Sequence, residues 1–297
     1  MSGVIMDGKV VAREIKTKIR QEVSRLNIEP TLATVMVGND PASKAYLNQK
    51  QTACLDVGIH SKNIELPAST EQAELERTLR RLNDDSSVTG ILLQLPLPKG
   101  INKLSALDTI SPTKDVDGLT PSNFGLLLHG DGKLIPCTPR SVVVLLKIYL
   151  GQLSGHHSVI VNRSNVIGRP LSQLLLNLDS TVTVCHSKTR DLPSICRQAD
   201  ILITGIGRRP GFVVTTNFVK PGATVIDAGT SIIDGRVTGD VDFLQVAQVA
   251  GHITPVPGGV GPVTTAMLLY NTLLAVCLEK HLDIGFTPEE LYRSEHT

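Results

Sequence analysis

The chain has 297 residues, of which 41% are hydrophobic and 19% charged, with a formal net charge of +1. This profile predicts a globular protein of two ordinary domains, argues against nucleic acid or an anionic membrane as a partner, and excludes a disordered chain. We find no apolar run of the roughly 18 residues that a membrane span needs. The five cysteines are scattered without a Cys-x-x-Cys pair and no signal-peptide layout is present, so we expect no metal site and a cytoplasmic location.

Strands and helices alternate in the first third of the chain. After a first amphipathic helix, predicted over 10–26, strands are expected at 32–37, 63–66 and 90–97. Helices beginning near Ser43 and after Ser69-Thr70-Glu71-Gln72 separate these strands. A β-α-β-α-β order implies a parallel sheet.

Tyr46 and Lys50 lie four residues apart on the helix that follows the first of these strands. They therefore share one helix face near its N-terminus, where open α/β sheets bind ligands. A phenol beside an amine can carry out acid–base chemistry. Taken alone, such a pair is more often an ordinary solvated helix face.

One further polar position interrupts the third predicted strand, and another follows that strand. Gln94 stands between Leu93 and Leu95, and a buried amide needs partners. It is satisfied either by nearby backbone or by pointing from the strand end towards the Tyr46–Lys50 face. Asp117 belongs to an Asp-Val-Asp-Gly segment that, in isolation, predicts a turn; the acid spacing of a calcium-binding EF-hand is missing.

A stiff segment, Ile135-Pro-Cys-Thr-Pro139, marks the boundary to a second domain. There a strand at 158–161 leads into a tight loop, 162–168, and then into a helix. This order is typical of a dinucleotide-binding turn, in which the helix N-terminus offers free N–H groups to a pyrophosphate. Asn162 occupies the first glycine position, and asparagine tolerates the left-handed backbone that a glycine would provide.

The next strand, predicted over 181–185, favours one cofactor. Proteins that prefer NAD usually place an acid at this strand end to bind the ribose 2′-hydroxyl. Here the strand is followed by His186-Ser187-Lys188 without an acid, and Arg163 lies on the neighbouring loop. These residues favour a 2′-phosphate, and hence NADP. The alternative is a solvated polar turn.

The last third continues the α/β pattern. Strands are expected at 199–205 and 223–227, followed by a Gly/Pro-rich run, 254–262. A long apolar helix, 263–278, can pack back on the first domain, and we expect the polar tail after Ile284 to be frayed.

Five motifs occur together in one order over nearly the whole chain. They are Tyr46-x-x-x-Lys50, Gln94-Leu-Pro-Leu, Lys114-Asp-Val-Asp-Gly, Pro136-Cys-Thr-Pro and Pro255-Val-Pro-Gly-Gly-Val-Gly-Pro262. The set resembles the bifunctional methylenetetrahydrofolate dehydrogenase/methenyltetrahydrofolate cyclohydrolase (FolD) family. This resemblance implies an α/β protein of two domains with a cleft between them. Residues 1–139 plus 263–297 would form the folate-binding catalytic domain, and 140–262 an NADP-binding Rossmann domain.

The resemblance also implies the chemistry and its residues. Methylenetetrahydrofolate is oxidised by NADP, and the methenyl product is hydrolysed to 10-formyltetrahydrofolate. The implied catalytic residues are Tyr46, Lys50, Gln94 and Asp117. The implied substrate-binding residues are these four with Leu93, Leu95, Pro257, Gly258, Gly259, Val260 and Gly261, and the implied cofactor-binding residues are Asn162, Arg163, Ser164, Ser187 and Thr230. The family further implies a cytosolic homodimer acting on tetrahydrofolate one-carbon derivatives, which serve purine, methionine and histidine biosynthesis.

Two positions depart from the family pattern. Asn162 replaces a usual glycine, and Thr230 stands where an isoleucine is common. Both lie on the cofactor side, so one alternative is a member that retains only one of the two activities. A short-chain dehydrogenase also uses Tyr-x-x-x-Lys, but its glycine-rich turn comes before that pair. A non-catalytic ligand-binding protein is the alternative from another class.

Overall fold

The computed structural model describes residues 3–291, except for the side chains of residues 41–43, 45 and 46. The described chain forms two compact units. Residues 14–137 and 265–287 form the three-stranded unit; residues 3–13, 138–264 and 288–291 form the six-stranded unit. The expected two-domain α/β class is confirmed. The division differs from the predicted one at both chain ends, because each end bonds to the six-stranded unit.

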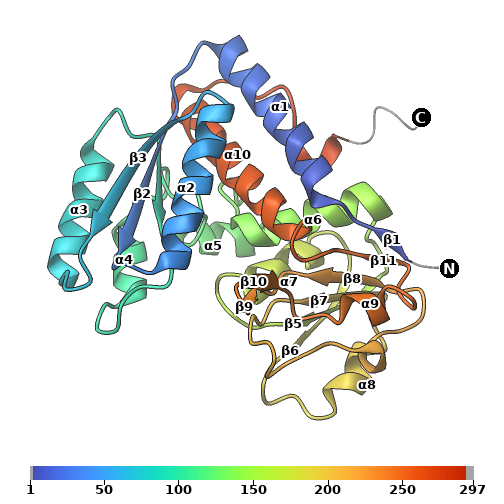
Figure 1. Cartoon of the computed structure of the whole chain (residues 1–297). Helices are drawn as coiled ribbons and strands as arrows, with labels where there is room; N and C mark the ends of the chain where they lie inside the picture. Colours follow the sequence, from blue (N-terminus) through green and yellow to red (C-terminus); the bar gives the residue numbers. More distant parts are fainter. Residues whose placement is uncertain (1–2, 292–297) are drawn as a thin grey trace. The chain divides into compact units, whose positions relative to one another are not determined.

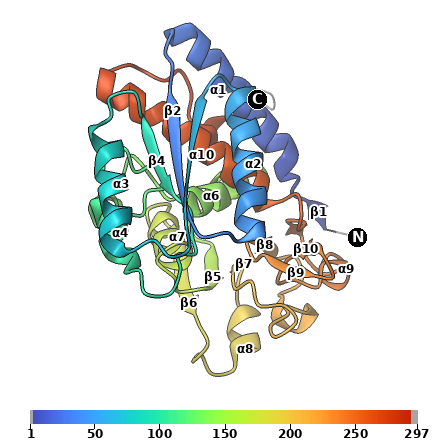
Figure 2. The ribbon, with the colours of Figure 1, turned by 60° about the vertical axis from the view of Figure 1, so that its left-hand side comes forward.

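The three-stranded unit is built on β2 (Thr31–Val37), β3 (His60–Leu66) and β4 (Gly90–Leu93). All pairs are parallel, in the order β3-β2-β4. The chain steps from β2 to β3 and then back past β2 to β4, so right-handed crossovers place α2 (Pro41–Asp56) and α3 (Gln72–Asp84) on opposite faces. Figures 1 and 2 show these two helices on either side of the sheet.

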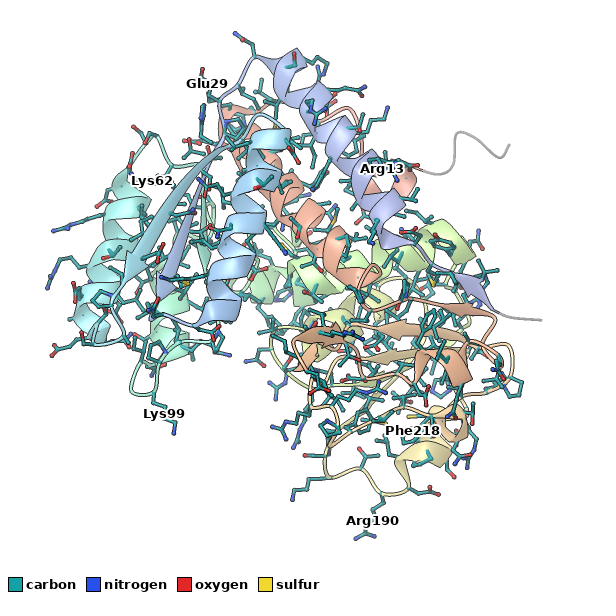
Figure 3. All side chains as sticks on the ribbon, in the orientation of Figure 1. Arg13, Glu29, Lys62, Lys99, Arg190 and Phe218 are labelled. Carbon is teal, nitrogen blue, oxygen red and sulfur yellow. The ribbon has the colours of Figure 1, made fainter. Side chains whose placement is uncertain are left out.

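The two edge strands of this sheet, β3 and β4, differ in burial. Every residue of β4 is buried, as are all residues of the central β2 except Thr31. The edge strand β3 is more exposed and carries charged side chains such as Lys62, labelled in Figure 3. Charges on an edge strand discourage pairing with another chain.

Further helices complete the two units. They are α1 (Gly8–Leu26), α4 (Lys103–Thr109), α5 (Pro121–His129), α6 (Cys137–Leu150) and α10 (Val260–Lys280). Helix α10 is long and apolar enough to cross a membrane by length and composition, which corrects our expectation of no such run; 72% of that stretch is buried within the protein.

The six-stranded sheet has the order β1-β11-β8-β7-β5-β6, and all its strands are parallel. Its strands are β1 (Val4–Ile5), β5 (His157–Val161), β6 (Thr181–Cys185), β7 (Ile201–Thr204), β8 (Thr224–Asp227) and β11 (His252–Ile253). The chain proceeds from β5 to β6 on one side and then returns to β7 on the other. The carboxyl ends of β5 and β7 therefore form a topological switch point, where such sheets bind ligands.

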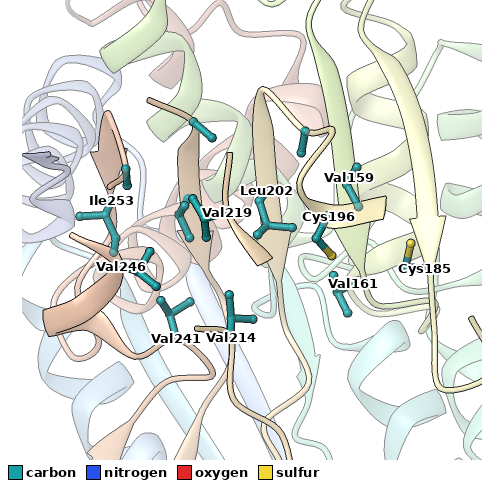
Figure 4. Packing of buried hydrophobic residues seen from close by; sticks show 14 residues of the cluster. Val159, Val161, Cys185, Cys196, Leu202, Val214, Val219, Val241, Val246 and Ile253 are labelled. Carbon is teal, nitrogen blue, oxygen red and sulfur yellow. The ribbon is translucent and has the colours of Figure 1, made fainter. Parts of the chain in front are cut away.

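Short elements surround this sheet. They are α7 (Gly168–Leu176), α8 (Leu192–Cys196), η1 (Thr216–Phe218), α9 (Phe243–Val246), the hairpin β9 (Ser231–Ile233) and β10 (Arg236–Thr238), and η2 (Pro288–Glu290). Figure 4 shows the apolar cluster on one face of the sheet, where Val159 and Leu202 from neighbouring strands are fully buried. Val225 on the next strand belongs to the same cluster and is also fully buried.

We had predicted that the chain frays after Ile284, but the described residues that follow it make ordered contacts. Tyr270 and Phe286 make an edge-to-face ring contact, with centroids 5.4 Å apart. In the six-stranded unit, the Arg140 guanidinium donates to both carboxylate oxygens of Glu289, at 2.8 and 3.2 Å. The predicted tail beyond residue 291 lies outside the described residues.

Candidate active site

Lys50 and Gln94 meet at the carboxyl edge of the three-stranded sheet. Lys50 lies on α2 and Gln94 directly follows β4; the Lys50 ammonium donates to Gln94 Oε1 at 2.6 Å. Gln94 Nε2 donates in turn to the Leu95 carbonyl at 2.7 Å, which fixes the orientation of the amide. Tyr46 lies one turn before Lys50 on α2, but its side chain is outside the described part.

The environment of Lys50 favours the neutral amine. Burial lowers the pKa of Lys50 from its ordinary value, while the negative charge of Asp117 opposes this shift. An amine that loses its proton more easily than a free lysine is able to act as a base closer to neutral pH.

Asp117 carries a carboxyl group with an unusual pKa. Burial, and then the neighbouring charge of Asp115, raise the pKa of Asp117 to about 6, although Lys50 lowers it. The backbone N–H and the thiol of Cys137 hydrogen bond to this carboxylate and stabilise its ionised form. The electrostatic coupling of Asp117 with Lys50 joins the two predicted catalytic groups in one network.

One supporting residue, Asn271, was not predicted from the sequence. Asn271 on α10 is fully buried, and its Nδ2 donates to the carbonyls of Val116 and Ile135, each at 2.8 Å, and contacts Cys137 Sγ at 3.6 Å. Asn271 thereby ties the backbone on both sides of the Asp117–Cys137 contact. No sequence signal could have found this link, because it joins positions more than 130 residues apart.

The other predicted folate-side residues divide between the two units. Leu93 ends β4 and is buried, and Leu95 follows Gln94. The segment 257–261 belongs to the six-stranded unit, where Gly259 N–H donates to the Pro255 carbonyl at 2.8 Å, just before α10 begins. A side chain at Gly259 would collide with that carbonyl, at 2.7 Å.

A cavity of about 590 Å3 lies at the switch point of the six-stranded sheet. Its lining includes Asn162, Arg163, Ser164, Ser187, Arg208 and Phe212. The size is within the usual range for ligand sites. Four of the five predicted cofactor residues therefore meet in one cavity, whose cationic and hydroxyl groups fit a phosphorylated dinucleotide. The exposed Thr230 is not among the residues that line it.

Asn162 does not act as we had predicted. It is not among the described residues with positive φ, so a left-handed backbone is not the reason that asparagine fits here. Instead its Nδ2 donates to the Gly205 carbonyl, which links the loop after β5 to the loop after β7. Helix α7 begins very close to the backbone of Asn162: a Cβ on Gly168, its first residue, would lie 2.0 Å from the Asn162 carbonyl oxygen.

A pair of buried aspartates shapes the neighbouring loops and was not predicted. Asp240 accepts hydrogen bonds from Thr204 Oγ1 and from the backbone N–H groups of Ile206 and Gly207, at 2.6–2.9 Å. Asp227 accepts from the N–H groups of Gly229 and Val241, at 2.9 and 2.8 Å, and burial raises its pKa to about 6. The two carboxylates hold the loops after β7 and β8 in place.

The fold and these two sites define a class: a two-unit α/β protein with a dinucleotide-type cavity on one unit and a lysine–amide–carboxylate network on the other. Residues 6–117 match the family model of the tetrahydrofolate dehydrogenase/cyclohydrolase catalytic domain. Residues 136–280 match the NAD(P)-binding domain of the same family.

Individual relatives agree with the family models. The chain is 48% identical over 281 residues to the bifunctional protein FolD of Cenarchaeum symbiosum, covering 94% of this chain and 100% of the relative. The crystal structure of the bifunctional enzyme FolD, a methylenetetrahydrofolate dehydrogenase/cyclohydrolase from Campylobacter jejuni, is 42% identical, with a TM-score of 0.89, and the match covers 94% of this chain and 100% of that one. A Trypanosoma brucei dehydrogenase–cyclohydrolase, solved with NADP and an inhibitor, is 38% identical with a TM-score of 0.89, covering 94% and 99%.

The chain belongs to the tetrahydrofolate dehydrogenase/cyclohydrolase family. The predicted resemblance is thereby confirmed. Neither the fold nor these relatives favour a short-chain dehydrogenase, a single-activity member or a non-catalytic binding protein.

Proposed function

We propose that this protein oxidises 5,10-methylenetetrahydrofolate with NADP and hydrolyses the methenyl product to 10-formyltetrahydrofolate. The hydrogen bond of 2.6 Å between Lys50 and Gln94, in a family with these two activities, carries the proposal. NADP supplies the nicotinamide ring that accepts a hydride from the bridging methylene. The residues of the chain bind the two ligands and move protons in the hydrolysis.

Lys50 is the proposed proton carrier of the hydrolysis. Water adds to the cationic methenyl carbon, forming a C–O bond, and the neutral amine of Lys50 takes the proton that the water loses. The hydroxyl group of this adduct then loses its proton as the C=O bond forms, and the bond from the carbon to the pterin ring nitrogen breaks. That nitrogen takes up a proton and the carbon remains as a formyl group on the other nitrogen, so one proton is released overall. The lowered pKa of Lys50 supports the first transfer, and the fixed Gln94 amide keeps the amine in place.

Asp117 is the proposed anchor of the pterin. An ionised carboxylate accepts two hydrogen bonds from the ring N–H and amino groups of a pterin, as carboxylates do with other planar donor pairs. Tyr46 would pack on the ring and share this network, together with Leu93 and Leu95 at the strand end. The Gly-rich segment 257–261 would let backbone approach the folate.

We propose that Arg163 and Ser187 bind the 2′-phosphate on the adenosine ribose of NADP. Both line the cavity at the switch point, and Ser187 follows β6, the strand whose end meets the adenosine ribose in this class of fold. A guanidinium pairs strongly with a phosphate dianion, so we infer a preference for NADP over NAD.

The test is the substitution Lys50→Met, assayed by the loss of methenyltetrahydrofolate absorbance. We expect hydrolysis to be abolished while the circular dichroism spectrum is retained. Lys44→Met is the matched control, because Lys44 lies on the same helix, is 45% exposed and pairs only loosely with Glu65, at 3.4 Å. Hydrolysis at the wild-type rate by Lys50→Met would exclude the proposed role.

We also propose that the protein works as a cytoplasmic homodimer and supplies one-carbon units for purine, methionine and histidine biosynthesis. Family membership supports this setting. Sedimentation of the purified chain, with a dimer expected near twice 31.9 kDa, tests the oligomeric part directly.

A further inference from the structure

The N-terminal turn of α7, where a pyrophosphate usually binds, has its backbone donors engaged within the chain. The Gly168 N–H donates to Asn162 Oδ1 at 3.1 Å, and the Ile167 N–H to Ser164 Oγ at 3.1 Å. The Arg169 N–H donates to the Ser164 carbonyl at 3.0 Å. Residue 170 is proline, which has no N–H. The expectation of free N–H groups at this helix start is therefore wrong.

These internal bonds are not easily exchanged for a ligand. Asn162 Oδ1 also accepts the Ser164 N–H at 2.7 Å, while its Nδ2 is bonded to the Gly205 carbonyl. A ligand that displaced the Asn162 side chain from these hydrogen bonds would leave its amide groups without partners, and each lost partner costs free energy. A phosphate in this cavity consequently needs donors other than the start of α7.

Two arginines of the cavity are able to supply such donors. Arg163 lies on the loop after β5 and Arg208 on the loop after β7, so they come from the two sides of the switch point. Within the part of the chain that the structure describes, neither guanidinium makes a hydrogen bond or ion pair. Arg209, next in sequence, has a structural role, because its Nη1 donates to the carbonyls of Gly239 and Val241, at 3.3 and 2.9 Å.

We propose that Arg208 binds the pyrophosphate of the dinucleotide, in place of the engaged amides of α7. The inference rests on the proposed NADP-dependent function. In this class of fold the pyrophosphate crosses the crevice between the two diverging strands, here β5 and β7, where Arg208 lies. The adenosine ribose lies towards β6, which leaves Arg163 and Ser187 to the 2′-phosphate. Arg208 is thus a binding residue for both NADP and NAD, whereas Arg163 discriminates between them.

The test is direct binding of NADP and of NAD to the ligand-free full-length protein by isothermal titration calorimetry. We expect Arg208→Gln to raise both dissociation constants by a similar factor, about tenfold or more, since a charge-assisted phosphate contact is lost. Arg163→Gln should raise the constant for NADP far more than that for NAD. Arg190→Gln is the matched control: Arg190 is an exposed arginine of the same unit that does not line the cavity, and Figure 3 shows it at the outside of the protein.

Three results would overturn the assignment. Unchanged affinities in Arg208→Gln would remove Arg208 from the site. A loss confined to NADP would move Arg208 to the 2′-phosphate. If the wild-type protein bound neither dinucleotide, the proposed function would fail together with this inference, whereas the first two results leave that function intact.

Discussion

At the scale of single residues, Asp117 shows how a carboxylate is prepared for a ligand. Burial and Asp115 disfavour its charge, while the Cys137 donors and Lys50 favour it. The resulting pKa of about 6 lies close enough to neutrality for these neighbours to decide the protonation state. A carboxylate that binds a pterin has to be ionised, because the protonated acid loses acceptor capacity.

Folate binding should therefore weaken as the pH falls through about 6, where Asp117 takes up a proton. In Cys137→Ala, one hydrogen bond to the charged form is lost, so the pKa of Asp117 rises further. We expect the midpoint of the KM–pH profile for the folate substrate to move to higher pH, with KM near the wild-type value at pH 8. Steady-state kinetics over pH 5–8.5 measure this shift.

Cys196→Ala provides the control for the Cys137 experiment. Cys196 is a second fully buried thiol, and it lies in the core of the six-stranded unit. Its removal should leave the profile of KM against pH in place. A profile for Cys137→Ala that coincides with that of the wild type would show that the thiol does not tune Asp117.

The sequence identifies residues that react, and fails for residues that support them. Lys50, Gln94 and Asp117 stand in recognisable local motifs, and the structure joins Lys50 to both partners. Asn271 lies in an apolar helix pattern with no motif of its own, and its contacts are made 134 to 155 residues away. The sequence predicts Asn162 as a site residue through its backbone conformation, whereas the structure shows that its side-chain hydrogen bonds hold the loop.

At the scale of elements, the junction of β5 and α7 depends on close backbone contact. Gly168 begins α7, and a Cβ there would lie 2.0 Å from the Asn162 carbonyl oxygen and 2.9 Å from the Arg163 nitrogen. Because these are backbone atoms, the loop itself would have to move. The geometry of the dinucleotide cavity is thus coupled to the absence of a side chain at one position.

We expect Gly168→Ala to destabilise the protein by about 2 kcal/mol, a typical cost of forcing an extra carbon into a packed site. It should also weaken NADP binding, because the Arg163 loop is displaced. Urea denaturation and calorimetric titration measure the two effects. Gly125→Ala is the control: Gly125 lies within α5 with no atom near its Cβ position, so alanine there should be neutral or stabilising by up to about 1 kcal/mol. Equal stabilities of the two variants would contradict the expected clash.

The alternation of elements was predictable because apolar periodicity is local. The strand predicted over 181–185 has the same bounds in the structure. The strand predicted over 32–37 differs from the observed strand only by Thr31 at its start. The strand predicted over 90–97 ends earlier, at Leu93, directly before Gln94. The two-residue β1 was missed, because a strand that short has no period and forms only by pairing with β11. The helix after Ser69-Thr70 has Glu71 as its N-cap, without the predicted capping-box bond.

At the scale of the whole molecule, an ion pair fixes the last described segment. Arg140 and Glu289 have side chains only 8% and 16% exposed. Burial raises the pKa of Glu289, but the Arg140 guanidinium outweighs burial and holds that pKa below its ordinary value. The stabilisation is therefore present at neutral pH and is lost as the pH falls through the lowered pKa of Glu289.

Glu289→Gln should lower the free energy of unfolding by about 3 kcal/mol at pH 7, because it leaves a buried guanidinium without its counter-charge. The difference from the wild type should shrink as the pH falls through the lowered pKa of Glu289, where its carboxylate takes up a proton. Denaturation curves at pH 7 and at an acidic pH below that lowered pKa measure both effects. The exposed neighbour Glu290 serves as the control through Glu290→Gln, which should change stability little. A constant difference at the two pH values would argue against the ion pair as its cause.

The division of the chain between the units has a consequence for synthesis on the ribosome. Strand β1 is made first, but its partner β11 emerges about 250 residues later. The three-stranded unit is likewise incomplete until Asn271 has been synthesised, because Asn271 hydrogen bonds to the backbone beside Asp117. Neither unit is a continuous stretch of chain, so neither can finish folding while the other is still unmade. The nascent protein thus holds two incomplete cores until α10 has left the exit tunnel, and a truncated product ending before residue 252 would leave both unfinished.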